Sequence, residues 1–196
     1  MPQTKGIIET HPWQPFLPEG CRLLMLGSFP PARKRWSMDF FYPNFTNDMW
    51  RIFGLCFFND KDHFVDQTHK TFLRADIESF LREYKIGLYD TAREVIRLKN
   101  TASDKDLEVV AAVDLGTMLR QIPHCTSIVT TGAKATSLAC EQLAIGQEPA
   151  VGTSHTFVFE DRLCRLYRMP SSSRAYPLRL EAKAESYRLM FAETLT

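Results

Sequence analysis

Residues 26–54 combine small, aromatic and amide side chains in a pattern that suits a pocket for a flat heterocycle. Gly27 lets the backbone approach a ligand closely, because it has no side chain. Phe41 and Tyr42 offer flat apolar faces on which a ring can stack, and Asn47 offers an amide that can hydrogen-bond to the edge of the ring. We therefore expect this stretch to bind an aromatic ring system.

A second stretch, residues 169–188, carries hydroxyl and guanidinium groups that can donate hydrogen bonds to phosphate oxygens. The donors that follow its first proline are Ser171, Ser172, Ser173 and Arg174. The plainer alternative is that these serines form a turn and cap the last helix of the chain. Both interpretations stay open from the residues alone.

The charge balance excludes a protein that coats nucleic acid or membrane through bulk electrostatics. The 196 residues contain 24 Lys+Arg and 23 Asp+Glu, so the formal net charge is +1. Any nucleic-acid contact must then come from a local patch. The compact basic run that could supply it is Arg33, Lys34 and Arg35, although a solvated loop is the default for such a run.

The cysteines and histidines show no spacing that suits a metal. The five cysteines include no C-x-x-C pair, so zinc, iron–sulfur and disulfide frameworks have little support. We find no secretory signal and no apolar run long enough to span a membrane, and we expect a monomer in the reducing cytoplasm. The motifs of α/β-hydrolases, P-loop proteins and dinucleotide-binding proteins are also absent from the sequence.

Four short apolar runs that end near Gly, Pro or polar residues predict buried strands, at residues 22–26, 85–89, 126–130 and 164–169. Helical spacing predicts helices over residues 49–57, 71–83, 107–119, 133–143 and 179–195. Residues 156–159 predict a hairpin that leads into the last strand, and residues 1–20, with four prolines, predict an irregular lead-in. Strands that alternate with helices indicate one α/β domain over residues 1–196, with a mostly parallel sheet whose carboxyl edge carries the function.

The residues at these strand ends resemble the uracil-DNA glycosylase superfamily, most closely its hypoxanthine-DNA (deoxyinosine) glycosylase-like and mismatch-specific branch. The L-G-S-x-P motif of that branch is matched by residues 26–30, its F-Y-Y-x-x-P-x-N-R-F-W segment by 40–50, and its G-[IL]-x-[LW]-D strand end loosely by 86–90. Its N-G-x-K-A element is matched by residues 131–135 and its L-P-S-[TS]-S motif by 169–173. The chain departs from these motifs at Phe45, Asp48, Met49 and Thr131.

The resemblance implies a three-layer α/β/α sandwich around a central four-stranded, mostly parallel sheet, to which the hairpin can add an antiparallel strand. It also implies a monofunctional DNA glycosylase of base-excision repair, which hydrolyses the N-glycosidic bond of hypoxanthine or uracil in DNA and needs no metal or other cofactor. Asn47 would orient the attacking water, and Ser28 stands where relatives keep an Asn or Asp for that water. The residues implied to bind the base are Gly27, Phe29, Phe41, Tyr42 and Asp90.

The same resemblance places the serine stretch and the basic run against DNA. Ser171, Ser172, Ser173 and Arg174 would pinch the phosphates, and Tyr176 would fill the gap left by an extruded base. We expect Arg33 to Arg35 to form one basic face with Arg168, Arg174 and Arg179.

Plainer roles remain for several of these residues. Asn47 could simply cap a helix, Asp90 could cap the segment after it, Ser28 could satisfy backbone groups in its turn, and Phe40 is better placed in the core. The rival functions are a catalytically silent member of the fold that binds nucleic acid or protein, and an unrelated nucleotide-binding α/β hydrolase.

Overall fold

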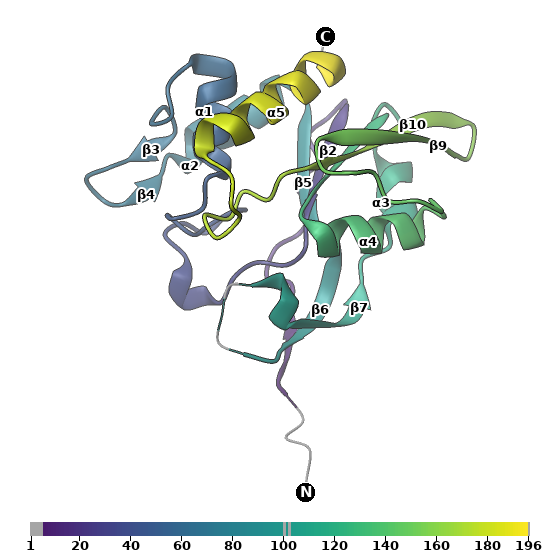
Figure 1. Ribbon diagram of the computed structural model, residues 1–196, viewed down its shortest axis with the longest axis horizontal. Coiled ribbons are helices and arrows are strands. Elements are labelled where there is room, and N and C mark those ends of the chain that lie inside the picture. Colours follow the sequence, from purple (N-terminus) through teal and green to yellow (C-terminus); the bar gives the residue numbers. More distant parts are fainter. Residues whose placement is uncertain (1–5, 100, 102, 196) are drawn as a thin grey trace, which may run out of the picture.

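A twisted main sheet runs through the centre of the molecule (Figure 1). The computed structural model describes residues 6–99, 101 and 103–195. The strands lie in the order β5 (Ile86–Asp90), β2 (Leu23–Gly27), β8 (Ser127–Thr131), β10 (Arg162–Met169) and β9 (Thr153–Phe159). The first four are parallel, and β9 pairs with β10 in the antiparallel direction. The predicted parallel sheet and its extra hairpin strand are therefore confirmed.

The register of the main sheet brings the carboxyl ends of its parallel strands level with one another. Gly27 at the end of β2 pairs with Asp90 at the end of β5, and Thr130 near the end of β8 pairs with both Leu26 and Arg168. Every residue of β2, β5 and β8 is buried, as expected for strands covered on both faces. The segments that follow these strands therefore leave the sheet from one edge.

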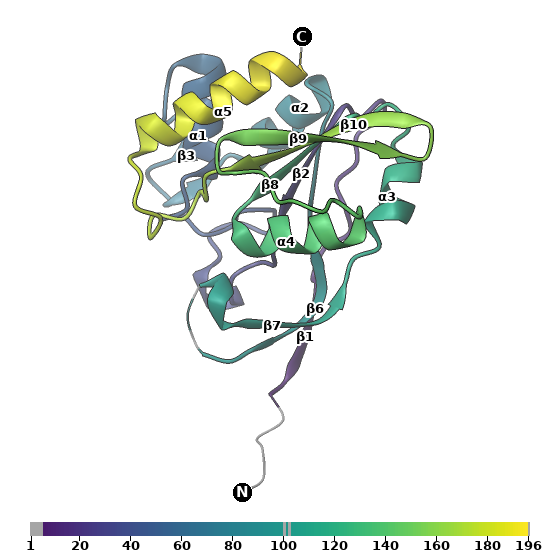
Figure 2. The same ribbon diagram turned by 45° about the vertical axis from the view of Figure 1, so that its right-hand side comes forward.

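Helices cover both faces of the main sheet and complete three layers. Figures 1 and 2 show α1 (Met49–Phe58), α2 (Arg74–Glu83) and α5 (Leu180–Thr194) on one side, and α3 (Leu115–Gln121) and α4 (Ala133–Gln142) on the other. The expected three-layer α/β/α sandwich around a mostly parallel sheet is therefore confirmed. Among the described residues, no helix has the length and apolarity that crossing a membrane would require.

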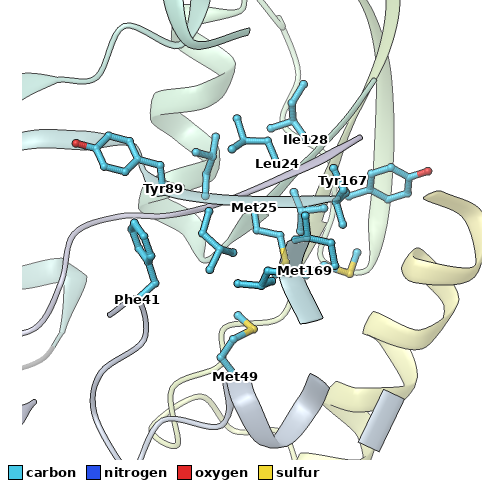
Figure 3. Close-up of a cluster of buried hydrophobic side chains, with 14 of the residues drawn as sticks. Leu24, Met25, Phe41, Met49, Tyr89, Ile128, Tyr167 and Met169 are labelled. Carbon is cyan, nitrogen blue, oxygen red and sulfur yellow. The ribbon is translucent and has the colours of Figure 1, made fainter. Parts of the chain in front are cut away.

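One large apolar core packs the main sheet against helices on both of its faces, and residues of α1 to α5 all belong to it. Figure 3 shows part of it: Met25 lies on the side of the strands that faces Phe41 and Met49, and Leu24 and Ile128 lie on the opposite side. The first six residues of α1 are buried, because this helix packs its amino-terminal half directly against the sheet and α5. This packing fixes the segment before α1, which carries many of the predicted functional residues.

A small antiparallel sheet lies beyond the carboxyl edge of the main sheet (Figures 1 and 2). It consists of β1 (Ile8–Thr10), β6 (Ala92–Arg97) and β7 (Leu107–Ala112), in the order β1-β6-β7. The connection from β6 to β7 contains a short 3-10 turn, η2 (Asp104–Asp106). Since β6 follows β5 directly, this sheet is held against the same edge.

The structure corrects the prediction for residues 1–20 and for residues 107–119. The lead-in contains β1, which pairs with β6 and could not be seen in so short a segment. Residues 107–112 form a strand because their buried and exposed positions alternate, with the β-branched Val109 and Val110 at the centre. The helix begins only at Leu115, where Asp114 caps it by accepting a hydrogen bond from the backbone N–H of Thr117.

The other predicted elements are present with small shifts of their bounds. Helix α2 begins at Arg74 rather than Thr71, because β4 (Thr71–Phe72) first pairs with β3 (Val65–Asp66). The basic run forms a 3-10 turn, η1 (Arg33–Arg35), on the chain between β2 and α1.

Candidate active site

A cavity of about 1390 Å³ opens at the carboxyl edge of the main sheet. Segments that follow β2, β5, β8 and β10 all contribute to its wall, together with residues before α1 and the η2 turn. Of the residues predicted to act on the base or the water, all line it: Gly27, Ser28, Phe29, Phe41, Tyr42, Asn47 and Asp90. The fold therefore brings together side chains from distant parts of the sequence.

The predicted stacking residues differ in how much of their rings is free. Phe41 is buried and packs against Trp13 and Tyr89, with ring centroids 5.2 and 6.2 Å away, so it is chiefly a wall of the core. Tyr42 is only partly buried as a residue, and its hydroxyl lies 3.2 Å from the Thr131 hydroxyl across the cavity. Burial raises the pKa of this phenol, and Asp90 raises it further, so Tyr42 is a neutral ring.

Phe29 and Phe40 occupy packed positions. Phe29 belongs to the small core under the second sheet, with Val95 and Leu107, and it presents only a margin to the cavity. Phe40 is buried in the main core, as the sequence indicated, and stacks against Trp50 with centroids 6.3 Å apart.

Asp90 is held in the floor of the cavity by a histidine. Its Oδ2 accepts a hydrogen bond of 2.8 Å from Nε2 of His11, and both residues are buried. A Cβ on Gly27 would overlap Oδ1 of Asp90, so the glycine at the end of β2 is what admits this carboxylate. The alternative role of Asp90 as a cap is wrong, because the segment that follows is strand β6.

His11 itself was not predicted. It lies in the lead-in, directly after β1, and its ring contacts Tyr89 and Phe29 at centroid distances of 4.5 and 5.4 Å. No local pattern marks a histidine that reaches a site 79 residues away, so only the tertiary structure reveals it.

Ser28 hydrogen-bonds to a second carboxylate that the sequence analysis did not single out. Its hydroxyl donates to Oδ2 of Asp104 at 2.7 Å, and both residues line the cavity. Burial raises the pKa of the Asp104 carboxyl, and the hydrogen bond from Ser28 opposes that effect. Asp104 stands on η2, in a polar loop whose position over the cavity depends on the pairing of β6 with β7.

Asn47 lies at the cavity wall immediately before α1. Its Oδ1 accepts a hydrogen bond of 2.9 Å from the backbone N–H of Met49, so the capping role is present in the structure. One lone pair of Oδ1 and the two N–H groups of Nδ2 remain for a water or a base. An amide has no pKa near neutrality, so Asn47 can orient a water but cannot take its proton.

The serine stretch after β10 forms a compact turn at the cavity. Ser171 Oγ accepts from the backbone N–H of Ser173, and Ser173 Oγ accepts from that of Ala175, each at 3.2 Å. Ser172 is buried, and its carbonyl accepts from the backbone N–H of Asp48 at 2.9 Å. The turn-forming alternative is thus present, whereas the serines do not cap α5, which begins after Arg179.

A buried ion pair ties the serine turn to helices α1 and α5. Lys183 Nζ donates to Asp48 Oδ2 at 3.0 Å and to the Ser173 carbonyl at 2.8 Å. Arg174 Nε donates to the other oxygen of Asp48 at 3.1 Å. Asp48, which departs from the motif of the family that the sequence resembles, is therefore the carboxylate that neutralises a buried lysine.

The predicted DNA-binding residues differ in their exposure and in their distance from the cavity. Arg33, Lys34 and Arg35 are exposed, and the Arg33 guanidinium lies 5.0 Å from the Trp36 ring centroid. Arg174 and Tyr176 line the cavity.

The two other arginines of the expected basic face differ in their surroundings. Arg168 also lines the cavity, and its guanidinium lies 3.3 Å from a Glu148 carboxylate oxygen. Arg179 is exposed directly before α5. Two arginines of the expected face, Arg168 and Arg174, are thus partly neutralised by carboxylates, and the face as a whole stays a prediction.

Within the described residues, no three His, Cys, Asp or Glu side chains gather in a way that could hold a metal ion. The polar groups that line the cavity are carboxylates, amides, hydroxyls and cationic side chains. The carboxylates are those of Asp90, Asp104, Glu108 and Glu148, the amides are those of Asn44 and Asn47, and the cations are those of Lys105, Lys134, Arg168 and Arg174. Such a set can hydrogen-bond a ring, orient a water and stabilise positive charge that develops nearby.

The fold has a counterpart among solved structures. The solution NMR structure of a candidate uracil DNA glycosylase from Methanosarcina acetivorans matches it with a TM-score of 0.59 and 20% sequence identity, over 94% of this chain and 99% of that chain. No family model and no curated protein matches the sequence. The likeness is therefore one of fold, over nearly the whole length of both chains.

Proposed function

We propose that this protein is a DNA glycosylase that hydrolyses the N-glycosidic bond of a deaminated base, hypoxanthine or uracil, in DNA. The observation that carries the proposal is the cavity at the carboxyl edge, where the ends of four parallel strands and the segments after β2, β8 and β10 converge. The likeness of the fold to a candidate uracil DNA glycosylase supports it.

The cavity has the groups that an extruded base requires. Tyr42 supplies a neutral ring on which the base can stack. The buried Phe41 ring forms part of the cavity wall and excludes water there. Asp90, which His11 holds in place, presents a carboxylate oxygen that can accept a hydrogen bond from a ring N–H. Hypoxanthine and uracil both carry such an N–H beside a carbonyl, and Asn47 can donate to the carbonyl.

The reaction proceeds through a sugar that carries positive charge while the base leaves as an anion. Carboxylates in the cavity stabilise the positive sugar, and fixed N–H donors stabilise the leaving base. Asn47 orients the water that attacks C1′, and Ser28 lies on the same cavity wall. The products are a free base and an abasic site, with no covalent intermediate on the protein.

The serine turn and the basic run would hold the DNA. Ser171, Ser173 and Arg174 stand at the cavity mouth with donors for phosphate oxygens, and Tyr176 is placed beside them to occupy the gap in the duplex. Arg33 to Arg35 add exposed positive charge next to the segment that follows β2.

A cleavage panel tests this proposal. Single- and double-stranded oligonucleotides that carry uracil, hypoxanthine or a mismatched base are incubated with the protein, and abasic sites are detected by alkaline strand scission. We expect excision of at least one deaminated base, and a loss on the order of 10²-fold or more in the double variant Ser28→Ala/Asn47→Ala.

The matched control is Ser186→Ala/Gln147→Ala, which removes a hydroxyl from a half-buried position and an amide from an exposed position, both outside the cavity. The control should retain wild-type activity. If the wild type and the Ser28→Ala/Asn47→Ala variant were equally inert on the whole panel while both bound DNA, the protein would be a silent binder and not an enzyme. Excision of bases from free nucleosides but not from DNA would indicate a nucleoside hydrolase.

A further inference from the structure

The proposed reaction needs a proton acceptor that Asn47 cannot supply. A water that attacks C1′ must lose a proton, and an amide oxygen is far too weakly basic to take it. Ser28, in the place where relatives keep an Asn or Asp for the water, is also too weak a base on its own. The acceptor must therefore come from another part of the cavity.

We propose that Asp104, on the η2 turn between β6 and β7, is the catalytic carboxylate that takes the proton from the attacking water, and that Ser28 positions it. This inference rests on the proposed glycosylase function. Asp104 lines the same cavity as Asn47 and Tyr42, and its Oδ2 is fixed by the hydroxyl of Ser28 at 2.7 Å. Its Oδ1 has no hydrogen-bond partner among the described residues, so this oxygen is free to accept from a water.

Several elements place Asp104 at the cavity rather than in bulk solvent. Residue 104 reaches Ser28 across 76 positions of the chain, because β6 and β7 pair and carry the η2 turn over the end of β2. Gly132, immediately before α4, lies beside it, since a Cβ there would be in ordinary contact with Oδ2 at 3.8 Å. The carboxylate therefore stands between the segments that follow β2 and β8.

The charges around Asp104 suit a base. Burial and the nearby Asp90 carboxylate raise its pKa, whereas Lys134 on α4 and Arg97 on β6 lower it without cancelling that effect. Tyr42 nearby is a neutral ring, because burial raises the pKa of the phenol and the Asp90 and Asp104 carboxylates raise it further. A carboxylate with a raised pKa is a stronger base than an exposed one, which favours proton transfer from water.

The proposed step balances as a hydrolysis. The C1′–N bond breaks, and its electron pair leaves with the base. The water oxygen forms the new bond to C1′, and one water proton moves to Oδ1 of Asp104. The base anion takes a proton from solvent, Asp104 returns its proton to solvent, and the products are the free base and a sugar with a hydroxyl at C1′.

The test compares Asp104→Asn with Asp106→Asn in single-turnover assays on the best oligonucleotide of the cleavage panel. Asparagine at 104 can still accept the Ser28 hydrogen bond, so the turn is retained while the basic group is removed. We expect the rate of Asp104→Asn to fall on the order of 10²–10⁴-fold. Asp106 belongs to the same turn but does not line the cavity, so Asp106→Asn should stay within about 2-fold of wild type.

A pH profile separates a base from a merely structural carboxylate. The single-turnover rate of the wild type should fall as the pH is lowered and Asp104 becomes protonated. The pH profile of Asp104→Asn should lack this decrease at low pH, which we call the acid limb. Ser28→Ala removes a hydrogen bond that lowers the pKa of Asp104, so its acid limb should move to higher pH. Thermal unfolding curves that match wild type show that each variant is folded.

The outcomes distinguish this inference from the function on which it rests. If the wild type excises a base and Asp104→Asn does so equally well with the same acid limb, Asp104 is not the base, while the glycosylase function stands. If the wild type excises no base from any oligonucleotide, both proposals are overturned.

Discussion

His11 fixes the position of the Asp90 carboxylate at the cavity through a hydrogen bond. Nδ1 of His11 lies 3.2 Å from the backbone nitrogen and 3.0 Å from the carbonyl oxygen of Trp13, and Nε2 lies 2.8 Å from Oδ2 of Asp90. Tyr89 and Phe29 enclose the imidazole, so its orientation is fixed by packing as well as by hydrogen bonds. The histidine thereby keeps a buried carboxylate both satisfied and directed at the cavity.

Replacement of His11 by phenylalanine should destabilise the protein. The ring would still pack against its aromatic neighbours, but Asp90 would lose its hydrogen-bond donor while buried. We expect a loss of about 1–3 kcal/mol in the free energy of unfolding, measured by urea denaturation at neutral pH. Because Asp90 is proposed to contact the base, the same variant should also show altered binding of the base.

The matched control is His69→Phe, which breaks the same kind of contact at the surface. Nδ1 of His69 lies 2.7 Å from Oδ2 of Asp66, and the His69 side chain is 75% exposed. The free energy of unfolding should change by less than about 0.5 kcal/mol in this variant. Equal losses in the two variants would show that the burial of the His11 pair is irrelevant.

The elements of the main sheet could be predicted because their signals are local. Strands β2, β5 and β8 are short, fully buried runs, and β10 alternates buried with exposed positions. The alternation of these strands with helices sets the parallel sheet and its functional edge. The prediction that residues between Gly27 and Asn47 line the site followed from the position of that edge. These predictions needed only the spacing of the apolar residues and the residues at which each apolar segment ends.

The rest of the site depends on elements whose signals are weak. Strands β1 and β6 are short and partly exposed, and their pairing joins segments about 85 residues apart, so no local pattern reveals them. Only through this sheet does His11 reach Asp90 and does Asp104 reach the cavity. The capping role of Asn47 and the turn of the serines, by contrast, were open alternatives that local hydrogen bonds realise.

Helices α1 and α5 and the serine turn are joined by a buried charge. Lys183 on α5 is fully buried, and Asp48 beside α1 is its carboxylate partner. A buried lysine without a partner is expensive, so this contact holds the three segments in one arrangement. The position of the serine turn at the cavity therefore depends on α5.

Lys183→Met should destabilise the protein far more than Arg174→Met, although both lysine and arginine bind Asp48. Removal of Lys183 leaves a buried carboxylate with one partly exposed partner, and we expect a loss of about 3–5 kcal/mol in the free energy of unfolding. The Arg174 side chain is 53% exposed, so its removal should cost at most about 1 kcal/mol. Urea denaturation of both variants measures the difference, and equal losses would contradict the assigned role of Lys183.

At the scale of the whole molecule, a net charge of +1 must be reconciled with the polyanionic substrate that we propose. Arg168 and Arg174 are near carboxylates, so they contribute less free positive charge than their number implies. The exposed η1 turn differs, since Lys34 shares a shallow hollow with Arg97 and Lys99, which Glu9 only partly offsets. Under the proposed function, contact with DNA is therefore weak and local, as suits an enzyme that must move along the duplex.

Salt dependence of DNA binding should reveal that local contact. Affinity for an undamaged, fluorescently labelled duplex is measured by anisotropy between about 50 and 200 mM salt, the range over which phosphate contacts weaken strongly. Loss of two phosphate contacts in Lys34→Gln/Arg35→Gln should weaken binding at low salt and make the slope of log K against log salt shallower by about 1.8. The control Lys61→Gln/Arg120→Gln removes the same charge from exposed residues that do not line the cavity, and it should keep the wild-type slope. Equal changes of slope in both variants would mean that binding depends only on the net charge of the protein. The η1 turn would then make no specific contact with DNA.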